Sequence, residues 1–174
     1  MSFVSTTTKT LLLLGVPAIL AACSESSATD SKVSGTAAKA ADIVELDVYK
    51  SPTCGCCTSW IEHADKHGFA STVHHPDDLN AVKDQYGVAA RLRSCHTAVS
   101  EAGYVFEGHV PAKLVTQFLN NPPAGAIGLS VPGMPAGSPG MEMGDRFDPY
   151  PVVLMNKDGT FSLYQEIKQQ EEQY

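Results

Sequence analysis

Three cysteines within four residues constrain this chain more than any other feature; they are Cys54, Cys56 and Cys57. An apolar run at residues 43–49 precedes them and predicts a buried strand, and residues 55–67 predict a helix. The thiols therefore fall on a strand-to-helix turn, where backbone N–H groups and the helix dipole favour thiolate over thiol. A thiolate is both a nucleophile and a soft metal ligand, so redox chemistry and Cu(I) or Zn(II) binding are both open.

Residues 1–22 predict a secretory signal peptide rather than part of the folded protein. Their apolar core, at residues 11–20, is too short to span a bilayer as a stable helix. The sequence LAAC that ends at Cys23 has the pattern of a bacterial lipobox, which predicts cleavage before Cys23 and lipidation of that cysteine. A plain signal peptidase site near Ala22 is the alternative. Ser24 after the cysteine indicates the outer membrane, with attachment by acyl chains and not by a spanning helix.

Residues 23–42 are rich in Ser, Ala, Thr and Lys and show no apolar period, which predicts a flexible tether. The length of 174 residues suits one domain with such appendages. The formal net charge is −7, and removal of the signal peptide with its one lysine gives 11 − 19 = −8. An acidic chain without a basic patch is not expected to bind nucleic acid.

The cysteines that remain after Cys23 would lie in the periplasm, an oxidising compartment. They are Cys54, Cys56, Cys57 and Cys95. Two structural disulfides are therefore one hypothesis for their role. Cys56 and Cys57 are adjacent, and a bridge between neighbours is strained, so three clustered thiols make an awkward disulfide framework.

Further elements follow the cysteine turn in regular alternation. Residues 69–74 predict a second strand, and residues 77–86 predict a helix with an N-cap at the Asp77-Asp78 pair. Residues 97–107 predict a hairpin with a Gly-containing turn, and a helix begins at Pro111 and ends before residue 120. The order is β-α-β-α-β-β-α, which predicts an α/β fold with parallel pairing of the first two strands.

This order, with cysteines after the first strand, is similar to the thioredoxin fold. Cys54 and Cys57 also have the C-x-x-C spacing of its redox members. Thioredoxin relatives usually carry a cis-proline just before the third strand, where this chain has Ser94-Cys95-His96. That departure would place Cys95 and His96 beside the three clustered thiols, which favours a metal pocket over a surface for docking substrates.

A Pro/Gly/Met-rich loop is predicted at residues 124–150, and loops of this length are usually functional or disordered. Residues 151–164 predict a C-terminal hairpin that pairs with the sheet edge or covers it. The folded domain is thus expected to span residues 43–166. The Gln- and Glu-rich residues 167–174 are expected to be a frayed tail.

Copper fits the cysteine pattern better than zinc or an iron–sulfur cluster. Cu(I) prefers thiolate and thioether ligands, and bridging sulfurs allow more than one ion. Structural zinc sites usually use two ligand pairs spaced two to four residues apart, and the C-x-C-C spacing matches neither that pattern nor a common ferredoxin run. The predicted metal ligands are Cys54, Cys56, Cys57, Cys95, His96, Met134, Met141 and Met143.

The methionines are included because they lie on a loop and not at helical spacing on a core face. Three other histidines are less specific candidates. His109 is a possible ligand but could equally cap the following helix or satisfy a loop. His63 and His67, at i and i+4, are expected to form a solvated face of a short helix.

Separated motifs resemble the CopG-like family of periplasmic, thioredoxin-like copper-handling proteins, long catalogued as a domain of unknown function. The motifs are CGCC at residues 54–57, SCHT at 94–97, EGHVP at 107–111, VPGMP at 131–135 and GSPGME at 137–142. The resemblance covers residues 43–166. It implies a copper site on the cysteines that holds several Cu(I) ions, a role in copper resistance, and interconversion of Cu(I) and Cu(II).

The leading prediction is a lipid-anchored periplasmic protein that buffers, transfers or redox-cycles copper, with other copper-resistance proteins as possible partners. Whether it is an enzyme stays open. One alternative is a thiol–disulfide oxidoreductase with Cys54 as nucleophile and Cys57 as resolving thiol. Another is a structural protein held by two disulfides.

Overall fold

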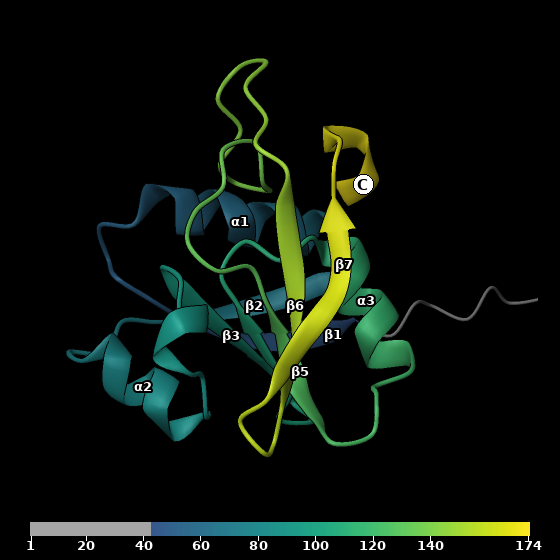
Figure 1. Cartoon of the computed structure of the whole chain (residues 1–174). Helices are drawn as coiled ribbons and strands as arrows, with labels where there is room; N and C mark the ends of the chain where they lie inside the picture. The colour runs from purple at the N-terminus through teal and green to yellow at the C-terminus, as the bar shows by residue number, and fades with distance from the viewer. Residues whose placement is uncertain (1–42) are drawn as a thin grey trace, which may run out of the picture. The chain divides into compact units, whose positions relative to one another are not determined.

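The computed structural model describes residues 43–174, in which one seven-stranded sheet is combined with helices on both of its faces (Figure 1). The elements are β1 (Val44–Lys50), α1 (Gly55–Lys66), β2 (Phe69–His74), α2 (Leu79–Gln85), η1 (Ala90–Leu92), β3 (His96–Ser100), β4 (Val105–Glu107), α3 (Ala112–Asn120), β5 (Ala126–Ser130), β6 (Tyr150–Asn156), β7 (Phe161–Ile167) and η2 (Gln170–Gln173). The signal peptide, the tether and Cys23 lie outside the described residues.

The strand order in the sheet is β2-β1-β3-β4-β5-β6-β7. β1 is parallel to β2, and β4 is parallel to β5, whereas the other neighbours are antiparallel. The fold is therefore mixed α/β, and its first seven α and β elements follow the predicted order. Asp78 caps α2 as predicted, because its side chain accepts hydrogen bonds from the N–H groups of Asn80 and Ala81 at 2.8 and 3.1 Å.

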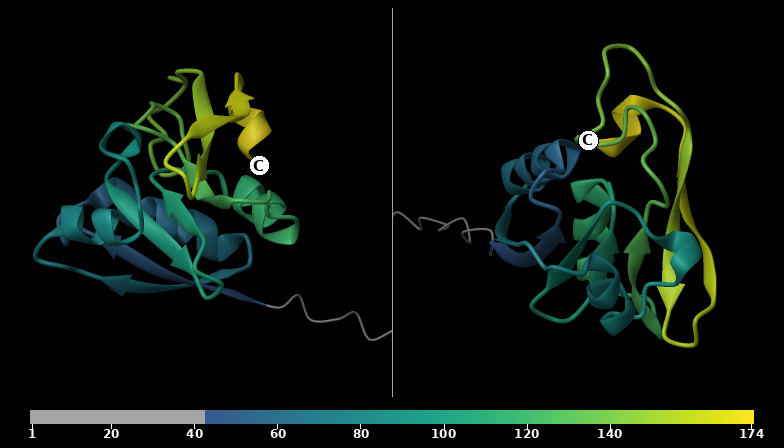
Figure 2. Two further views of the ribbon diagram at one scale, coloured as in Figure 1. Left: turned by 60° about the horizontal axis from the view of Figure 1, so that its bottom comes forward. Right: turned by 90° about the vertical axis from the view of Figure 1, so that its left-hand side faces the viewer.

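The two faces of the sheet are buried by different helices (Figure 2). α1 and α3 cover one face with Trp60 and Phe118, which pack on β-strand residues such as Phe106. The segment after α2 covers the other face and contributes Val88 and Leu92. Because side chains alternate along a strand, central strands covered on both faces are apolar at successive positions.

The prediction of one long loop at residues 124–150 is wrong in its first part, because residues 126–130 form β5. β5 lies between β4 and β6, so the predicted C-terminal hairpin, β6 and β7, continues the sheet. Gly128 made this segment resemble a loop in sequence. A Cβ atom at this position would overlap the carbonyl oxygen of Val105, so glycine is what allows β5 to approach β4.

The last residues are packed, and the prediction of a frayed tail from residue 167 is wrong. The side chain of Gln173 is fully buried in η2 and donates a hydrogen bond of 2.9 Å to the carbonyl of Gly137. It also accepts a hydrogen bond from the hydroxyl of Tyr150. η2 thus lies against the loop between β5 and β6 (Figure 1). The polar composition gave no sign of this, because the anchoring group is a side-chain amide.

None of the helices in residues 43–174 is long and apolar enough to cross a membrane.

The prediction that His63 and His67 form a solvated face of α1 is wrong for His63, which is buried, whereas His67 is exposed. The Nε2 atom of His63 accepts a hydrogen bond of 3.1 Å from the N–H group of Ala112, in the first turn of α3. Pro111, the N-cap of α3, makes no side-chain cap bond, so His63 satisfies one of the free N–H groups of that helix.

We expect the pH dependence of stability to report this contact. Burial, and after it the nearby His67, lowers the pKa of His63 from 6.5 to about 4. The unfolded chain therefore binds more protons between these two pH values, so the contribution of His63 is full above pH 6.5 and is lost as the pH falls towards 4. In urea unfolding of the metal-free protein, His63→Gln should lose less stability than the wild type on acidification from pH 7.5 to 4.5. His67→Gln is the matched control, and equal losses in all three proteins would contradict the expectation.

Candidate metal centre

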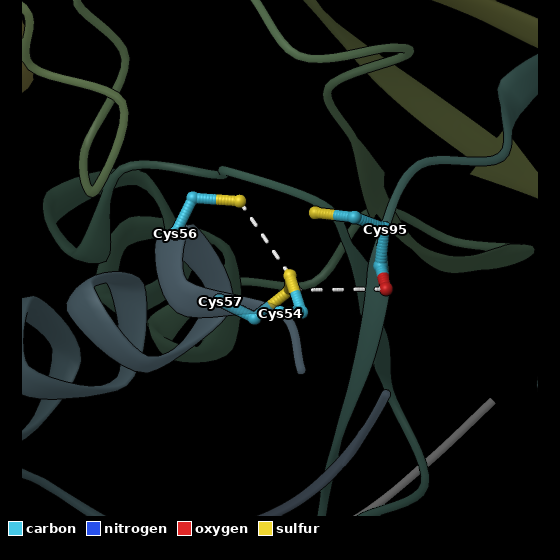
Figure 3. Close-up of side chains that lie close together, drawn as sticks. All are labelled: Cys54, Cys56, Cys57 and Cys95. Carbon is cyan, nitrogen blue, oxygen red and sulfur yellow. Dashed lines mark hydrogen bonds between the residues drawn. A yellow bond between two sulfur atoms is a disulfide. The ribbon is translucent and has the colours of Figure 1, made fainter. Parts of the chain in front are cut away.

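The cysteine turn lies at the amino end of α1, as predicted (Figure 3). Cys54 is the N-cap residue, and Cys56 and Cys57 lie in the first turn. Lys50, the last residue of β1, pairs with His96, the first residue of β3. The turn after β1 and the residues before β3 therefore meet at the same end of the sheet. The four sulfur atoms of Cys54, Cys56, Cys57 and Cys95 lie within 4.8 Å of one another.

Two of these cysteines are oxidised. Cys54 and Cys57 form a disulfide with their Cα atoms 5.4 Å apart, and Cys56 and Cys95 are the free cysteines among residues 43–174. The sulfur of Cys56 lies 3.5 Å from that of Cys54, and the sulfur of Cys57 lies 3.9 Å from the carbonyl oxygen of Cys95 (Figure 3). The hypothesis of two disulfides among these four cysteines is thus wrong. Reduction of the single bridge would raise the number of available thiols from two to four.

A second group of donor atoms adjoins the first. The sulfur of Cys95 lies 3.4 Å from Nδ1 of His96 and 3.1 Å from Nε2 of His109. These three donor atoms also lie within 4.8 Å of one another, so Cys95 belongs to both groups. The sequence left the role of His109 open. The structure brings it to the site, because His109 lies just after the end of β4, the antiparallel neighbour of β3.

His96 and His109 both have the neutral ring form that binds metals. Burial is the main cause that lowers the pKa of His96 and of His109, so both rings are neutral near pH 7. Nδ1 of His109 lies 2.8 Å from the carbonyl oxygen of Pro139, which can only accept, so Nδ1 carries the proton and Nε2 presents its lone pair to Cys95. Among residues 43–174, Nε2 of His96 is the one buried side-chain N or O atom without a hydrogen-bond partner.

The protonation state of Cys95 differs from the thiolate form that the sequence predicted for cysteines at the amino end of a helix. Burial, and after it the neighbouring Cys56, raises the pKa of the Cys95 thiol to about 12. Without metal this thiol is protonated at neutral pH, and its S–H group is placed to donate to Nε2 of His109. Binding of a metal ion by Cys95 would therefore release a proton.

Part of the chain matches a family model, and most of it matches two solved structures. Residues 92–141 match a family model described as "Protein of unknown function, DUF411". Two solved structures, titled "Copper resistance protein copG" in Form 2 and Form 1, are 43% and 44% identical to this chain. Each match has a TM-score of 0.68 and covers 72% of this chain and 98% of the other. The chain belongs to the CopG family. No curated protein sequence matches it.

The membership that the sequence motifs predicted is thus confirmed.

In this member of the CopG family, the loop between β5 and β6 lies on the cysteine turn. A Cβ atom at Gly140 would lie 2.7 Å from the carbonyl oxygen of Cys56, which shows how closely the loop approaches α1. On the other side of the site, the carbonyl of Gly133 accepts a hydrogen bond from the hydroxyl of Ser94, next to Cys95.

The three loop methionines differ in exposure. Met134 and Met143 are 56% and 61% exposed, whereas Met141 is half-buried. Met134 follows Gly133, and Met141 follows Gly140, so the backbone at both positions adjoins the cysteine site. Their roles as thioether ligands stay predictions, as does that of Met143.

Lys83 and Glu107, which were not predicted as site residues, form a buried ion pair beside Cys95 and His96. The available signal was Glu107 itself, a charged residue at the end of the apolar run Val105-Phe106 in a predicted strand. A carboxylate at a buried strand position requires a partner, because an unpaired buried charge is costly. Nothing in the sequence identified Lys83 as that partner.

Proposed function

We propose that this protein binds Cu(I) on the sulfurs of Cys54, Cys56, Cys57 and Cys95 and buffers, transfers or redox-cycles copper in copper resistance. The observation that carries the proposal is the approach of four cysteine sulfurs to within 4.8 Å of one another. The two matched structures are of copper resistance proteins, which supports the same metal.

The donor set fits Cu(I) in its chemistry. Thiolates and neutral imidazoles are ligands that this soft ion accepts, and adjacent thiolates can bridge several ions. His96 supports the fit, because its buried Nε2 atom lacks a partner and its Nδ1 atom faces Cys95. The full proposed set is Cys54, Cys56, Cys57, Cys95, His96 and His109, with Met134, Met141 and Met143 from the loop.

Each part of the chain has a distinct task in this proposal. The amino end of α1 brings three of the four cysteines together, with Cys54 at its N-cap and Cys56 and Cys57 in its first turn. The carbonyl of Pro139 holds His109 in the tautomer whose Nε2 can bind a metal. The loop packs on the first turn of α1 at Gly140 and so places its methionines near the cysteine turn. Bound copper would supply one-electron redox chemistry.

Anaerobic metal loading tests the proposal. Reduced protein that starts after Cys23 is offered Cu(I) and Zn(II) together, and the bound metals are counted by elemental analysis. We expect at least one copper ion per chain, little zinc, and loss of copper in the variant with Cys54, Cys56, Cys57 and Cys95 all changed to Ser. Circular dichroism checks that this variant is folded. Absence of copper from the wild type, or its retention by the variant, would refute the site.

The Cys54–Cys57 disulfide favours a second function, thiol–disulfide exchange. In that reaction the Cys54 thiolate attacks a substrate disulfide, and Cys57 then resolves the mixed disulfide, which leaves Cys54–Cys57 oxidised and the substrate reduced. Metal-free protein that reduces insulin at the rate of a thioredoxin, and that retains no copper, would favour this function over copper binding.

We further propose a thioredoxin-like core for this chain, supported by the order of its first seven α and β elements. The lipobox at Cys23 supports a lipid-anchored position in the periplasm, on the outer membrane, where copper ions and other copper-resistance proteins would be its partners. The acidic surface would favour the approach of cations, and it gives no support for a nucleic-acid partner.

A further inference from the structure

A buried ion pair lies beside the metal centre and has no role in the proposal above. Lys83 of α2 and Glu107 of β4 have side chains only 3% and 0% exposed, and Nζ lies 2.5 Å from Oε1. Lys83 also donates to the hydroxyl of Thr97 at 2.9 Å. Stability alone does not explain such a pair, because well-packed apolar residues of similar volume often replace one without loss.

The carboxylate of Glu107 binds the chain on both sides of the Cys95-His96 pair. Its Oε1 atom accepts a hydrogen bond of 2.6 Å from the N–H group of Ser94, immediately before Cys95. Its Oε2 atom accepts one of 2.6 Å from the hydroxyl of Thr97, immediately after His96. Both oxygens of one rigid, planar group are thus used to hold two proposed ligands in place.

The bond to Ser94 fixes backbone that the sheet does not reach. β3 begins at His96, and its pairing with β1 ends there, so Ser94 and Cys95 lie beyond the ladder of strand hydrogen bonds. Glu107 supplies the acceptor for the N–H group of Ser94 at this point. Gly108, the residue after Glu107, donates its N–H group to the carbonyl of His96 at 2.9 Å. Glu107 and Gly108 together therefore bind Ser94, His96 and Thr97, the residues that flank Cys95.

We propose that Glu107 is a positioning residue for the metal centre. Through Ser94 and Thr97 it fixes Cys95 and His96 so that their donor atoms face the α1 cysteines and His109. Lys83 keeps the carboxylate paired in the core. The identity of the bound ion rests on the proposed function, whereas the position of Cys95 can be measured without any metal.

Two double variants distinguish the role of Glu107 as a hydrogen-bond acceptor from the role of its charge. Lys83→Met with Glu107→Leu, called the Met/Leu variant below, removes both the acceptor and the charge. It should keep the protein folded, since apolar residues replace both members of the pair. Lys83→Met with Glu107→Gln, called the Met/Gln variant below, also removes the charges. It retains a carbonyl oxygen that can accept a hydrogen bond from the N–H group of Ser94. Val115→Ala, in the core of α3, is the control for a general loss of stability.

The first readout is the rate at which iodoacetamide alkylates Cys95 in metal-free protein, resolved by mass spectrometry. The Met/Leu variant should raise this rate by about 10-fold or more, because the half-buried sulfur becomes mobile. The Met/Gln variant should restore most of the wild-type protection, and Val115→Ala should leave the rate unchanged. Hydrogen exchange of the Ser94 amide should rise in the Met/Leu variant alone.

The second readout is Cu(I) affinity, which we expect to fall by about 10- to 100-fold in the Met/Leu variant, the range seen when the partners of metal ligands are removed. A folded Met/Leu variant with unchanged Cys95 alkylation and unchanged Cu(I) affinity would overturn the proposal. Should that variant not fold, Thr97→Val decides: a faster alkylation of Cys95 supports positioning, and an unchanged rate overturns it. A wild type that binds no copper would refute the proposed function, but the alkylation rates would still decide the role of Glu107.

Discussion

Replacement of Cys95 by Ser is expected to lower the affinity for Cu(I) by at least about 100-fold, beyond the loss typical of groups that only support ligands. The reason is that its sulfur belongs both to the four-cysteine group and to the group with His96 and His109. Competition with a coloured Cu(I) chelator, under anaerobic and reducing conditions, measures the effect. Serine has nearly the shape of cysteine, so circular dichroism should show an unchanged fold.

Cys56→Ser is the matched control for this prediction. Cys56 is half-buried like Cys95, but it belongs to the four-cysteine group only. Its replacement leaves Cys95, His96 and His109 complete, so its effect on affinity should be the smaller of the two. Equal losses in both variants would show that the histidine group contributes nothing, and an unchanged affinity of Cys95→Ser would remove that residue from the site.

Reduction of the Cys54–Cys57 disulfide should at least double the amount of Cu(I) that the protein retains. The oxidised protein offers two thiols, Cys56 and Cys95, whereas the reduced protein offers four. A sulfur in a disulfide cannot become the thiolate that binds a soft metal ion. The measurement is an anaerobic Cu(I) titration of protein treated with dithiothreitol, which is then removed, beside protein kept oxidised.

The double variant Cys54→Ser, Cys57→Ser is the control, because it has the same two free thiols in both states. Its copper content should not respond to the reductant. Oxidised wild type that retains as much copper as reduced wild type would show that Cys54 and Cys57 are not ligands. The site would then consist of Cys56, Cys95 and the two histidines.

Local patterns predicted the fold well where an element carries its own signal. The cysteine turn, the cap at Asp78 and the apolar strands are of this kind, and each is present. β5 was missed because it is short and contains Gly128, whose role depends on the approach of Val105 from another strand. The packing of Gln173 was missed for a similar reason, since its partner, Gly137, lies 36 residues away.

The site shows the same division between local and long-range information. The α1 cysteines were evident from sequence, and counting elements brought Cys95 and His96 beside them. His109 could not be assigned, because its tautomer is set by the carbonyl of Pro139 in a distant loop. The oxidation state of Cys54 and Cys57 was equally out of reach, because the spacing C-x-x-C is compatible with a bridge and with two thiols.

The shared sulfur of Cys95 has a thermodynamic consequence for loading. Ions held in both donor groups would have this sulfur as a common ligand, so occupancy of one group must change the free energy of binding in the other. Such coupling is reciprocal: whatever the first ion does to the affinity for the second, the second does equally to the first. A titration should therefore depart from the sum of two independent binding curves, with either partly filled molecules or fully filled ones favoured, according to the sign of the coupling.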